Sequence, residues 1–391
     1  MRVIVVGGGV AGTVSAIALR RLGAEVTVFE AYQDPGGEVG SFLSLAANGL
    51  RGLAAIDCLD RVRDRGFPVA RQRMWARSGK LLGDVPRGRL SGDPLHSVTL
   101  MRSQLVGELR AAAEEAGARI ITGEQFAHAT AVHDGVCARF TGGDTVTADL
   151  LVGADGIWSA TRRTLDPHAP NPRYAGIHVV SGRSDGIDVD EGVFNMVFAR
   201  NGAFIYIREP GGDLWWQAQV NSTTEPVIDG VDDAEWLRRL GTLYQAERLP
   251  SAIVAATTRL HRPTVNHVLD PVPIWHDRQT VLVGDAAHPV GAGQGASMAI
   301  EDGLVLAAAL GAAPSISAGL AEYERLRRPR ITRMQKAAED NREIKKAGAI
   351  KRTVEELFMP MVFRHFYEKA TAWLYTYQPQ TPAPSSQQPT A

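Results

Sequence analysis

Short runs of β-branched residues that stop at glycine recur along this chain. The first run, Val3 to Val6, is followed from Val10 by small and apolar residues at spacings of three to four, the period of an α-helix. Gly23 then provides a helix stop signal, and residues 25–30 form a second run of strand type. The pattern predicts a βαβ unit and therefore a parallel sheet.

The same periodicities predict further helices and two further junctions between a strand and a glycine turn. We expect helices over residues 48–63 and 103–116, and helical structure again from 299 to about 373. The apolar runs 150–152 and 281–283 each end at a glycine, as the first strand does. These two runs are therefore expected to join the same parallel sheet.

The middle of the chain has a different pattern. Segments 194–200, 203–208 and 214–221 are strand-like, and Asn201-Gly202 between the first two is typical of a two-residue hairpin turn. We expect an antiparallel sheet here. The predicted fold class is α/β, with a Rossmann-like nucleotide-binding domain, an inserted and mostly antiparallel β-sheet domain, and C-terminal helices.

The predicted organisation is discontinuous, because the nucleotide-binding domain is assembled from separate parts of the chain. The residues after Tyr377 are proline, glutamine, serine, threonine and alanine, too polar to form a core, so a disordered tail is expected. The expected divisions are the nucleotide-binding domain at 1–70, 98–165 and 273–345, the sheet domain at 71–97 and 166–272, a helical region at 346–376, and the tail at 377–391.

Composition narrows the function classes. The 391 residues are 45% hydrophobic and 22% charged, which is ordinary for a globular protein, and 42 Lys and Arg against 43 Asp and Glu leave no basic footprint for nucleic acid. Cys58 and Cys137 stand alone, without the spacing of a zinc site or a disulfide framework, so no metal site is predicted and a reducing cytosol is expected.

Two apolar stretches resemble targeting or membrane segments in composition. The uncharged run from Val3 to Leu19 contains four glycines, which suits a strand-to-helix turn better than a signal peptide. Pro314 ends the apolar stretch that begins at Leu304. We therefore expect a soluble, cytoplasmic protein without a membrane span.

The first glycine turn has the spacing Gly7-x-Gly9-x-x-Gly12. In this context the first glycine allows a tight turn, the second lets a pyrophosphate approach the backbone, and the third brings helix and strand together. Glu30, at the end of the second strand, is placed to bind an adenosine ribose. A glycine turn that binds nothing is the alternative, and this motif alone does not separate FAD from NAD.

A later pair of segments distinguishes between FAD and NAD. Residues 284–288, Gly-Asp-Ala-Ala-His, and residues 293–295, Gly-Gln-Gly, resemble segments of the class A flavoprotein monooxygenases of the para-hydroxybenzoate hydroxylase type. Residues 153–156 resemble the Asp-Gly segment of that family, Arg102 with Leu105 its R-x-x-L helix start, and residues 323–330 its Y-x-x-x-R-R-P-R stretch. The resemblance covers residues 1 to about 340 in chain order.

The resemblance implies an FAD-binding domain and roles for individual residues. Asp285 would bind the ribityl chain, with a helix N-cap as its alternative role, and the amides near Gly293 and Gly295 would lie near the flavin pyrimidine ring. Asp155 is either a turn residue or nucleotide-facing, and His288 is expected to hold the loop. The predicted cofactor-binding residues are Gly7, Gly9, Val10, Ala11, Gly12, Glu30, Arg102, Asp155, Asp285, Gly293, Gln294 and Gly295.

This chain departs from the family pattern in three places, one of which is Ala47, in place of the proline that precedes the corresponding helix at Asn48. Pro289 follows His288 directly and the loop to Gln294 is short, so the backbone near the flavin ring is expected to differ. Ala31 stands where relatives often carry Arg or Lys, so one contact to adenosine is expected to be missing.

The inserted sheet is expected to bind the substrate. Period two divides its side chains into two faces, and Tyr206, Trp216 and Gln217 are candidate pocket residues, with ordinary sheet core as the alternative for each. No catalytic side chain is identified, because the flavin itself carries the chemistry.

The resemblance implies a monomeric or homodimeric monooxygenase. It would use FAD, NADPH or NADH, and O₂, and pass one oxygen atom through a flavin C4a-hydroperoxide to a small, hydrophobic, aromatic substrate by hydroxylation or epoxidation. The alternatives are an FAD-dependent dehydrogenase, a halogenase, for which the W-x-W-x-I-P segment is missing, and a non-catalytic flavin-binding module.

Overall fold

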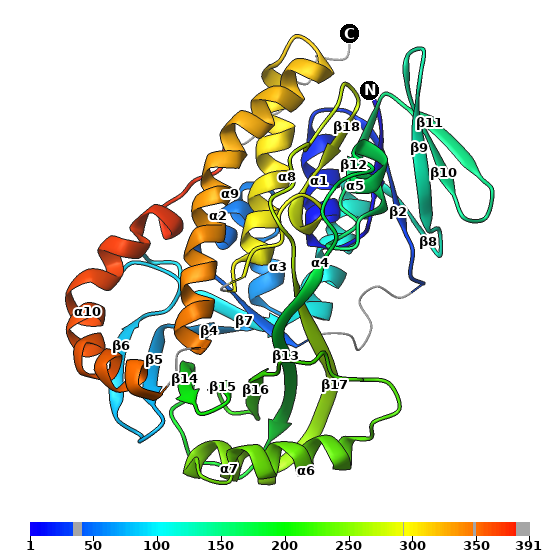
Figure 1. Ribbon diagram of the computed structural model, residues 1–391. Coiled ribbons are helices and arrows are strands. Elements are labelled where there is room, and N and C mark those ends of the chain that lie inside the picture. Colours follow the sequence, from blue (N-terminus) through cyan, green and yellow to red (C-terminus); the bar gives the residue numbers. More distant parts are fainter. Residues whose placement is uncertain (34–40, 292, 347–348, 381–391) are drawn as a thin grey trace.

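The computed structural model describes residues 1–33, 41–291, 293–346 and 349–380, with side chains outside 340–358. Two bodies of secondary structure are visible in Figure 1, a parallel sheet with its helices and a larger sheet below it. A curved helix, α10 (Ala349–Tyr375), runs beside both. Residues 381–391, most of the predicted disordered tail, lie outside the described residues.

A five-stranded parallel sheet forms the first body. Its strand order is β18-β12-β1-β2-β8, and every neighbouring pair is parallel. The predicted fold class is confirmed, because the β-branched runs that end at glycine are neighbours in this sheet. The strands are β1 (Arg2–Val6), β2 (Glu25–Glu30), β8 (Arg119–Thr122), β12 (Leu150–Gly153) and β18 (Thr280–Leu282).

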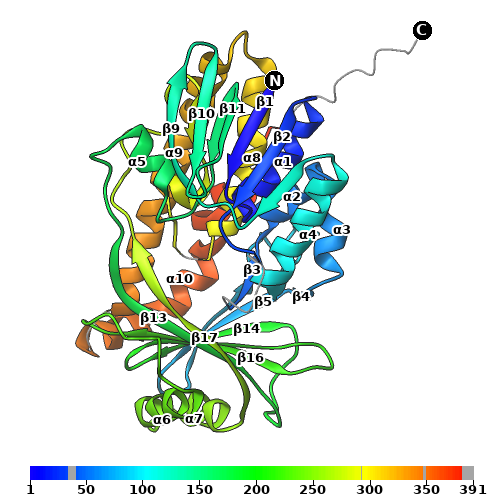
Figure 2. The same cartoon turned by 90° about the vertical axis from the view of Figure 1, so that its right-hand side faces the viewer.

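This sheet is covered on both faces, which is why its strands are apolar throughout. Val3 and Val5 point to the helices, and Ile4 and Val6 point to a three-stranded antiparallel sheet on the other side. Figure 2 shows the two layers on either side of β1. The covering elements are α1 (Val10–Arg21), α4 (Arg102–Glu115) and α8 (Gly295–Ala312) on one face, and β9 (Phe126–Val132), β10 (Gly135–Phe140) and β11 (Thr145–Ala148) on the other.

The second body is a seven-stranded sheet in which every neighbouring pair is antiparallel except β14 and β5. The predicted hairpin is confirmed, but its two loop residues are Arg200 and Asn201, because Gly202 already pairs with Ala199 at the start of the next strand. Gly202 has a φ of 133°, and a Cβ there would lie 1.9 Å from the carbonyl oxygen of Gln219. In sheet order the strands are β17 (Thr257–Val268), β13 (Arg173–Ser184), β16 (Leu214–Asn221), β15 (Gly202–Arg208), β14 (Val193–Ala199), β5 (Arg71–Ala76) and β6 (Leu81–Pro86).

Helices α6 (Asp233–Tyr244) and α7 (Arg248–Ala255) pack on the outer face of this sheet (Figure 1). The opposite, inner face contacts a small sheet next to the first body, because Phe42 and Phe67 place their rings against Trp215 at 5.8 and 5.3 Å. That small sheet consists of β3 (Phe42–Leu45), β7 (Ser97–Met101) and β4 (Phe67–Val69).

The single helix predicted over residues 48–63 is wrong. The segment forms α2 (Ala47–Ala55) and α3 (Leu59–Arg63), separated at Asp57, which has a φ of 56°. The amide of Cys58 donates to the carbonyl of Leu53 at 2.9 Å, which closes the end of α2. Neither glycine nor proline marks this break in the sequence, so the helical pattern continues through it.

The C-terminal helical structure also divides. After the short helices α5 (Ala160–Leu165) and η1 (Gly284–Ala286), the chain forms α8, α9 (Ile316–Lys346) and α10. Among the described helices, α8 is the one long and apolar enough to cross a membrane, but 67% of that stretch is buried in the protein. Since it packs between α1 and α9 and contains two buried carboxylates, α8 is a core helix of this fold.

Candidate functional site

Three strands end beside one another where the glycine turns begin. Val6 is level with Gly153, and Gly153 is level with Leu282, so β1, β12 and β18 deliver their following residues to one edge of the sheet. The carboxyl edge of an open parallel sheet is the usual place for a ligand site. Turns that lie far apart in the sequence therefore meet in space.

The three glycines of the first turn have different surroundings. Gly7 has a φ of 102°, and a Cβ there would lie 2.4 Å from the carbonyl oxygen of Ala154. A Cβ on Gly12 would lie 1.9 Å from the carbonyl oxygen of Gly7, whereas a Cβ on Gly9 would meet nothing within 4 Å. Gly7 and Gly12 are thus required for packing, and Gly9 borders open space at the start of α1.

The N-terminus of α1 faces this space. The amides of Val10 and Ala11 lie in its first turn, where no carbonyl of the helix accepts from them, and Gly9 precedes them in extended conformation. Such amides and the positive end of the helix dipole attract an anion. The open side of Gly9 and these amides together suit a pyrophosphate.

Glu30 fixes the turn to the end of β2. Its two carboxylate oxygens accept from the amide of Gly8 at 2.7 Å and from the amide of Tyr32 at 3.0 Å. The side chain is 7% exposed. The carboxylate stands beside the glycine turn, at the position where an adenosine ribose is bound in this type of site.

The second turn carries Asp155, which acts as a structural residue. It accepts from the hydroxyl of Ser159 at 2.5 Å and from both the amide and hydroxyl of Thr161. Arg162, 1% exposed, donates to the carbonyl of Ala286 at 2.9 Å. The buried arginine thus connects the second turn to the third, and both oxygens of Asp155 are already engaged.

The third turn brings Asp285 next to the first. A Cβ on Gly284 would lie 2.8 Å from the Cβ of Ala11, so residues 273 positions apart in the chain are in contact. The Asp285 side chain is accessible, and no described residue donates a hydrogen bond to it. Protein packed around it raises its pKa by desolvation, although His288 and Arg102 oppose the shift. Its carboxylate is free for a ligand.

A buried charge network supports this turn from behind. Asp302, fully buried, accepts from the amide of Gly284 at 2.8 Å and from Arg327 at 2.7 Å, and lies 2.7 Å from Nε2 of His288. Burial alone would raise the pKa of Asp302, but the neighbouring His288 and Arg327 outweigh it and lower that pKa to about 2. His288 therefore holds the loop, as expected from the sequence.

The same network extends to the start of α8. Glu301 accepts from Arg327 at 2.6 Å, from Arg330 at 2.7 Å and from the side-chain amide of Asn48 at 2.8 Å. Asn48 also reaches the side-chain oxygen of Gln294 at 3.4 Å. The interactions hold α2 against the turn that contains Gln294.

Helix α8 begins at Gly295, four residues before the predicted return of helical structure at residue 299. Gly293, with a φ of 71°, and Gly295 remain accessible on either side of the buried Gln294, and a Cβ on Gly295 would lie 4.0 Å from Oδ1 of Asp285. The helix N-terminus therefore lies beside Asp285, where its partial positive charge favours an anionic group. Arg102, at the first position of α4, is exposed and close enough to Asp285 to affect its charge.

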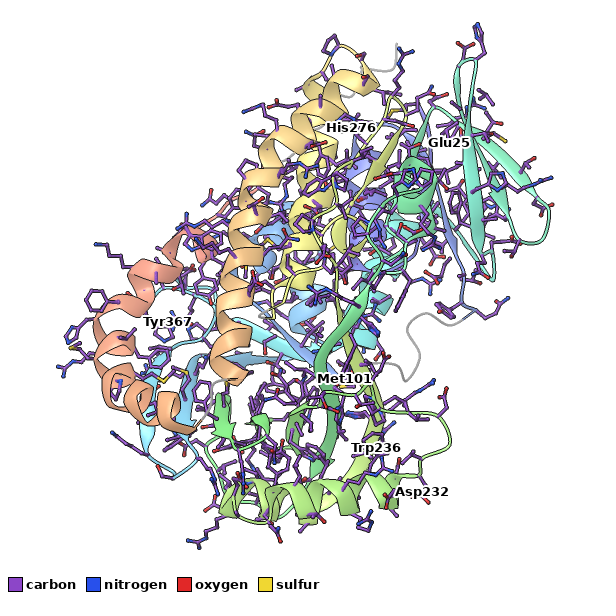
Figure 3. All side chains as sticks on the ribbon, in the orientation of Figure 1. Glu25, Met101, Asp232, Trp236, His276 and Tyr367 are labelled. Carbon is purple, nitrogen blue, oxygen red and sulfur yellow. The ribbon has the colours of Figure 1, made fainter. Side chains whose placement is uncertain are left out.

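The structure removes two of the three candidate pocket residues in the sheet. Tyr206 and Trp216 lie on the outer face, under α6 and α7, and Trp236 of α6 belongs to the same cluster (Figure 3). Trp216 is fully buried and stacks on Phe204 at 5.7 Å, and burial raises the pKa of Tyr206 to about 12. Period two separates two faces but does not tell which one is covered by helices.

Gln217 is on the other face. It is level with Ile205 on β15, so it points to the side where Phe42 and Phe67 pack. Its side chain is partly exposed. Of the three candidates, Gln217 alone faces the first body of the protein.

Sequence reasoning missed Arg87 and Gln72, which lie on this inner face. Nη1 of Arg87 donates to Oε1 of Gln72 at 2.5 Å, and the guanidinium lies 3.8 Å from the centre of the Phe194 ring. Arg87 follows a short edge strand in a polar stretch, where an arginine is usually solvated. The spacing of residues along the sequence therefore does not show where the Arg87 side chain lies.

The described side chains suit FAD and include no cluster of three or more His, Cys, Asp and Glu residues that suits a metal ion. Open space at Gly9, unpaired amides in α1, a carboxylate at the end of β2 and the unengaged Asp285 match the pyrophosphate, ribose and ribityl parts of that dinucleotide. The fold and site define a dinucleotide-binding flavoprotein.

Comparison with known proteins identifies the family. Residues 1–338 match the FAD binding domain family. The chain is 30% identical over 348 residues to the probable 2-heptyl-3-hydroxy-4(1H)-quinolone synthase AqdB2 of Rhodococcus erythropolis, with 87% of each chain covered. It is 27% identical over 391 residues to the 3-hydroxybenzoate 6-hydroxylase of Klebsiella oxytoca, with 96% of each covered.

Solved structures agree on the fold. HpxO of Klebsiella pneumoniae, complexed with FAD and uric acid, superposes with a TM-score of 0.83 at 22% identity over 96% of both chains. The chain belongs to the FAD binding domain family, and it is a class A FAD-dependent monooxygenase. The resemblance inferred from its motifs is thus confirmed.

Proposed function

We propose that this enzyme hydroxylates a small aromatic substrate, with NADH or NADPH as reductant and O₂ as the source of oxygen. Relatives support this proposal, since one is named as a 3-hydroxybenzoate 6-hydroxylase and another as a kynurenine 3-monooxygenase. We also expect the enzyme to work in the cytosol, where its two unpaired cysteines would stay reduced.

The contact between the first and third glycine turns carries the proposal. Ala11 and Gly284 touch, so the α1 amides and the Asp285 carboxylate border one site. The residues that would hold the pyrophosphate, adenosine and flavin parts of FAD are Gly9, Val10, Ala11, Glu30, Arg102, Asp285, Gly293, Gln294 and Gly295. Asp155 is left out, because its carboxylate holds the second turn through Ser159 and Thr161, whereas the Glu30 carboxylate stands beside the first glycine turn.

When bound, FAD takes electrons from the reduced nicotinamide and delivers one oxygen atom from O₂ to the substrate. The residues of the protein bind the cofactor and the substrate, orient them, and exclude water from the site. The amides at the N-terminus of α8 would stabilise negative charge on the flavin ring. The inner face of the seven-stranded sheet, with Gln217, would cover the substrate from the other side.

Isotope labelling tests this function. Purified enzyme loaded with FAD is screened with phenolic, indolic and quinoline compounds for stimulated NADH or NADPH oxidation, and reactions with active compounds are repeated under ¹⁸O₂. We expect the product to gain one labelled oxygen atom. A product that loses two hydrogens and gains no oxygen would instead identify a dehydrogenase, and a chlorinated or brominated product in the presence of halide would identify a halogenase.

A further inference from the structure

One side of α10 exposes large apolar side chains to solvent. Met361, Val362 and Phe366 are 54%, 46% and 54% exposed, and all three lie within two turns of this helix. Figure 1 shows α10 on the outside of the molecule, beside β6 and β5. Single exposed apolar residues are ordinary on a protein surface, but a group of them on one element marks a surface that another molecule covers.

The other side of α10 already packs on the protein. Met359, Phe363 and Tyr367, at spacings of four, join the apolar cluster of β5 and β6. A Cβ on Gly83 of β6 would lie 2.6 Å from the Phe363 ring, so the helix sits closely on that strand. Since α10 carries apolar residues on both sides, only one of its two apolar sides is covered by the described part of the chain.

The end of α10 is held firmly in place. Arg330 donates to the carbonyls of residues 373 and 374 at 2.9 and 3.1 Å, and Arg51 donates to the carbonyl of residue 375. Glu368 accepts from the amide of Ser91 at 2.7 Å. These bonds fix the helix to the body of the protein, so its exposed side is presented in one orientation.

The exposed side of α10 also carries positive charge. Val362, Phe366 and Lys369 follow one another at spacings of four and three, and Arg364 is exposed next to them; these residues and Met361 are called the outer strip. Between 359 and 375, where the side chains of α10 are described, Glu368 is the one acidic residue, and it is turned to Ser91. Along the sequence, residues 342–352 contain five Lys and Arg against one Glu.

Charge and size together indicate what covers the outer strip. Two copies of it would bring Lys369 and Arg364 of both chains together without an acid to pair them, which disfavours a second copy of this chain. The nine residues from Met361 to Lys369 span about 14 Å of a helix about 10 Å wide, whereas a stable protein interface buries on the order of 800 Å² on each partner. An anionic bilayer has no such minimum, and it accepts a convex helix with mixed apolar and cationic side chains.

We propose that the outer strip docks this enzyme on an anionic membrane surface. Met361, Val362 and Phe366 enter the boundary between headgroups and acyl chains, and Arg364 and Lys369 contact the lipid phosphates. The helix lies on the membrane and does not cross it, because its other side stays packed on β6. The docking is independent of the proposed reaction.

Docking would also bring the substrate side of the enzyme close to the lipid. Phe363 packs in the same cluster as Met74, and Met74 is level with Met196 and Ile205 on the inner face of the seven-stranded sheet. That face is therefore separated from the docked surface by the thickness of one helix, about 10 Å.

Flotation of vesicles tests the proposal on the FAD-loaded enzyme. Protein is mixed with phosphatidylcholine vesicles, with and without phosphatidylglycerol, and the vesicle-bound fraction is measured after density-gradient centrifugation. Each Lys or Arg near an anionic surface increases the affinity about fivefold, so Arg364 and Lys369 together should give a preference of about 25-fold for vesicles with phosphatidylglycerol. Added salt should weaken this binding, because ions screen exposed charges.

Two variants separate the apolar and the charged parts of the outer strip. Phe366→Ser should weaken binding to anionic vesicles about five- to tenfold, because about half of the ring is available for burial. The double variant Arg364→Gln, Lys369→Gln should reduce the preference for phosphatidylglycerol about 25-fold. Both should keep the parental FAD content and thermal unfolding, since the changed side chains are exposed.

Matched controls are exposed residues on other elements. Val227→Ser removes an apolar side chain that is 74% exposed, and Arg325→Gln removes an exposed cation of α9. Both variants should bind vesicles as the parent does.

Four results would overturn the proposal. The first is no enrichment of the parent enzyme on vesicles that contain phosphatidylglycerol, and the second is a Phe366→Ser variant that binds them as well as Val227→Ser does. The third is binding to polyglutamate but not to these vesicles, which would assign the outer strip to an acidic protein. The fourth is a dimer of the parent that Phe366→Ser converts to a monomer, which would assign the strip to a second copy of the chain.

Discussion

The two glycines that flank the start of α1 should separate cofactor binding from folding. A Cβ at Gly9 meets nothing within 4 Å, and the residue has φ −79° and ψ −168°, which any amino acid adopts. A Cβ at Gly12 lies 1.9 Å from the carbonyl oxygen of Gly7. Gly9→Ala should therefore fill the space of the pyrophosphate, whereas Gly12→Ala should separate helix from strand.

The two substitutions should affect different quantities: Gly9→Ala the stabilisation by FAD, and Gly12→Ala the stability of the apoprotein. FAD at one hundred times its dissociation constant stabilises the native protein by about 2.7 kcal/mol. If Gly9→Ala weakens binding about a thousandfold, the same FAD concentration contributes less than ~0.1 kcal/mol. The apoprotein should keep its stability or gain about 0.4–1 kcal/mol, because alanine restricts the unfolded chain. Overlap at Gly12 should cost about 1–3 kcal/mol or more even without FAD.

Thermal unfolding of apoprotein, with and without FAD, measures both effects, and quenching of flavin fluorescence gives the dissociation constant. The parent apoprotein should melt higher with FAD, Gly9→Ala should melt normally without responding to FAD, and Gly12→Ala should melt low in both conditions. A Gly9→Ala variant that binds FAD with parental affinity would refute the assignment of this space to the pyrophosphate. So would one that unfolds as easily as Gly12→Ala.

Three further predictions concern the third turn and its support. Asp285→Asn should weaken FAD binding about tenfold and leave the stability of the apoprotein unchanged, because no described residue donates to Asp285; loss of stability would assign it a structural role. Arg327→Met should cost about 3–5 kcal/mol in urea unfolding by leaving buried carboxylates unpaired, while the exposed Arg325→Met should have no effect; equal effects would contradict this. The folded pKa of Asp302, about 2, lies below its unfolded value, so its contribution to the free energy of unfolding, on the order of 2 kcal/mol, is complete above pH ~4 and lost as the pH falls towards ~2. Asp302→Asn should reduce this loss of stability at low pH. An unchanged pH dependence would show that another group causes it.

The parallel sheet and its glycine turns were predictable because their requirements are local. Gly7 needs a positive φ and Gly12 a missing Cβ, and both needs leave glycine in the sequence. The β-branched runs also predicted the buried strands of the parallel sheet. A binding site that depends on the backbone of a single turn can therefore be predicted from the spacing of its glycines.

The missed features depend on contacts between distant segments. The break at Asp57 lacks glycine or proline, so the local pattern does not show it. Both faces of β15 are apolar and buried, and only the packing of α6 and α7 shows that Tyr206 and Trp216 lie on the outer face of the sheet. Arg87 is recognisable only when the absence of a carboxylate among its described neighbours is known.

The nature and amount of bound flavin test the central claim most directly. Purified protein saturated with flavin and freed of excess is denatured, and the released flavin is identified by chromatography and counted against protein. The contact of the α1 turn with the Asp285 turn, together with Glu30 at the end of β2, predicts one FAD per chain. Equal retention of FMN, which lacks the adenosine, or no retention of any flavin, would contradict a site assembled from these three parts of the chain.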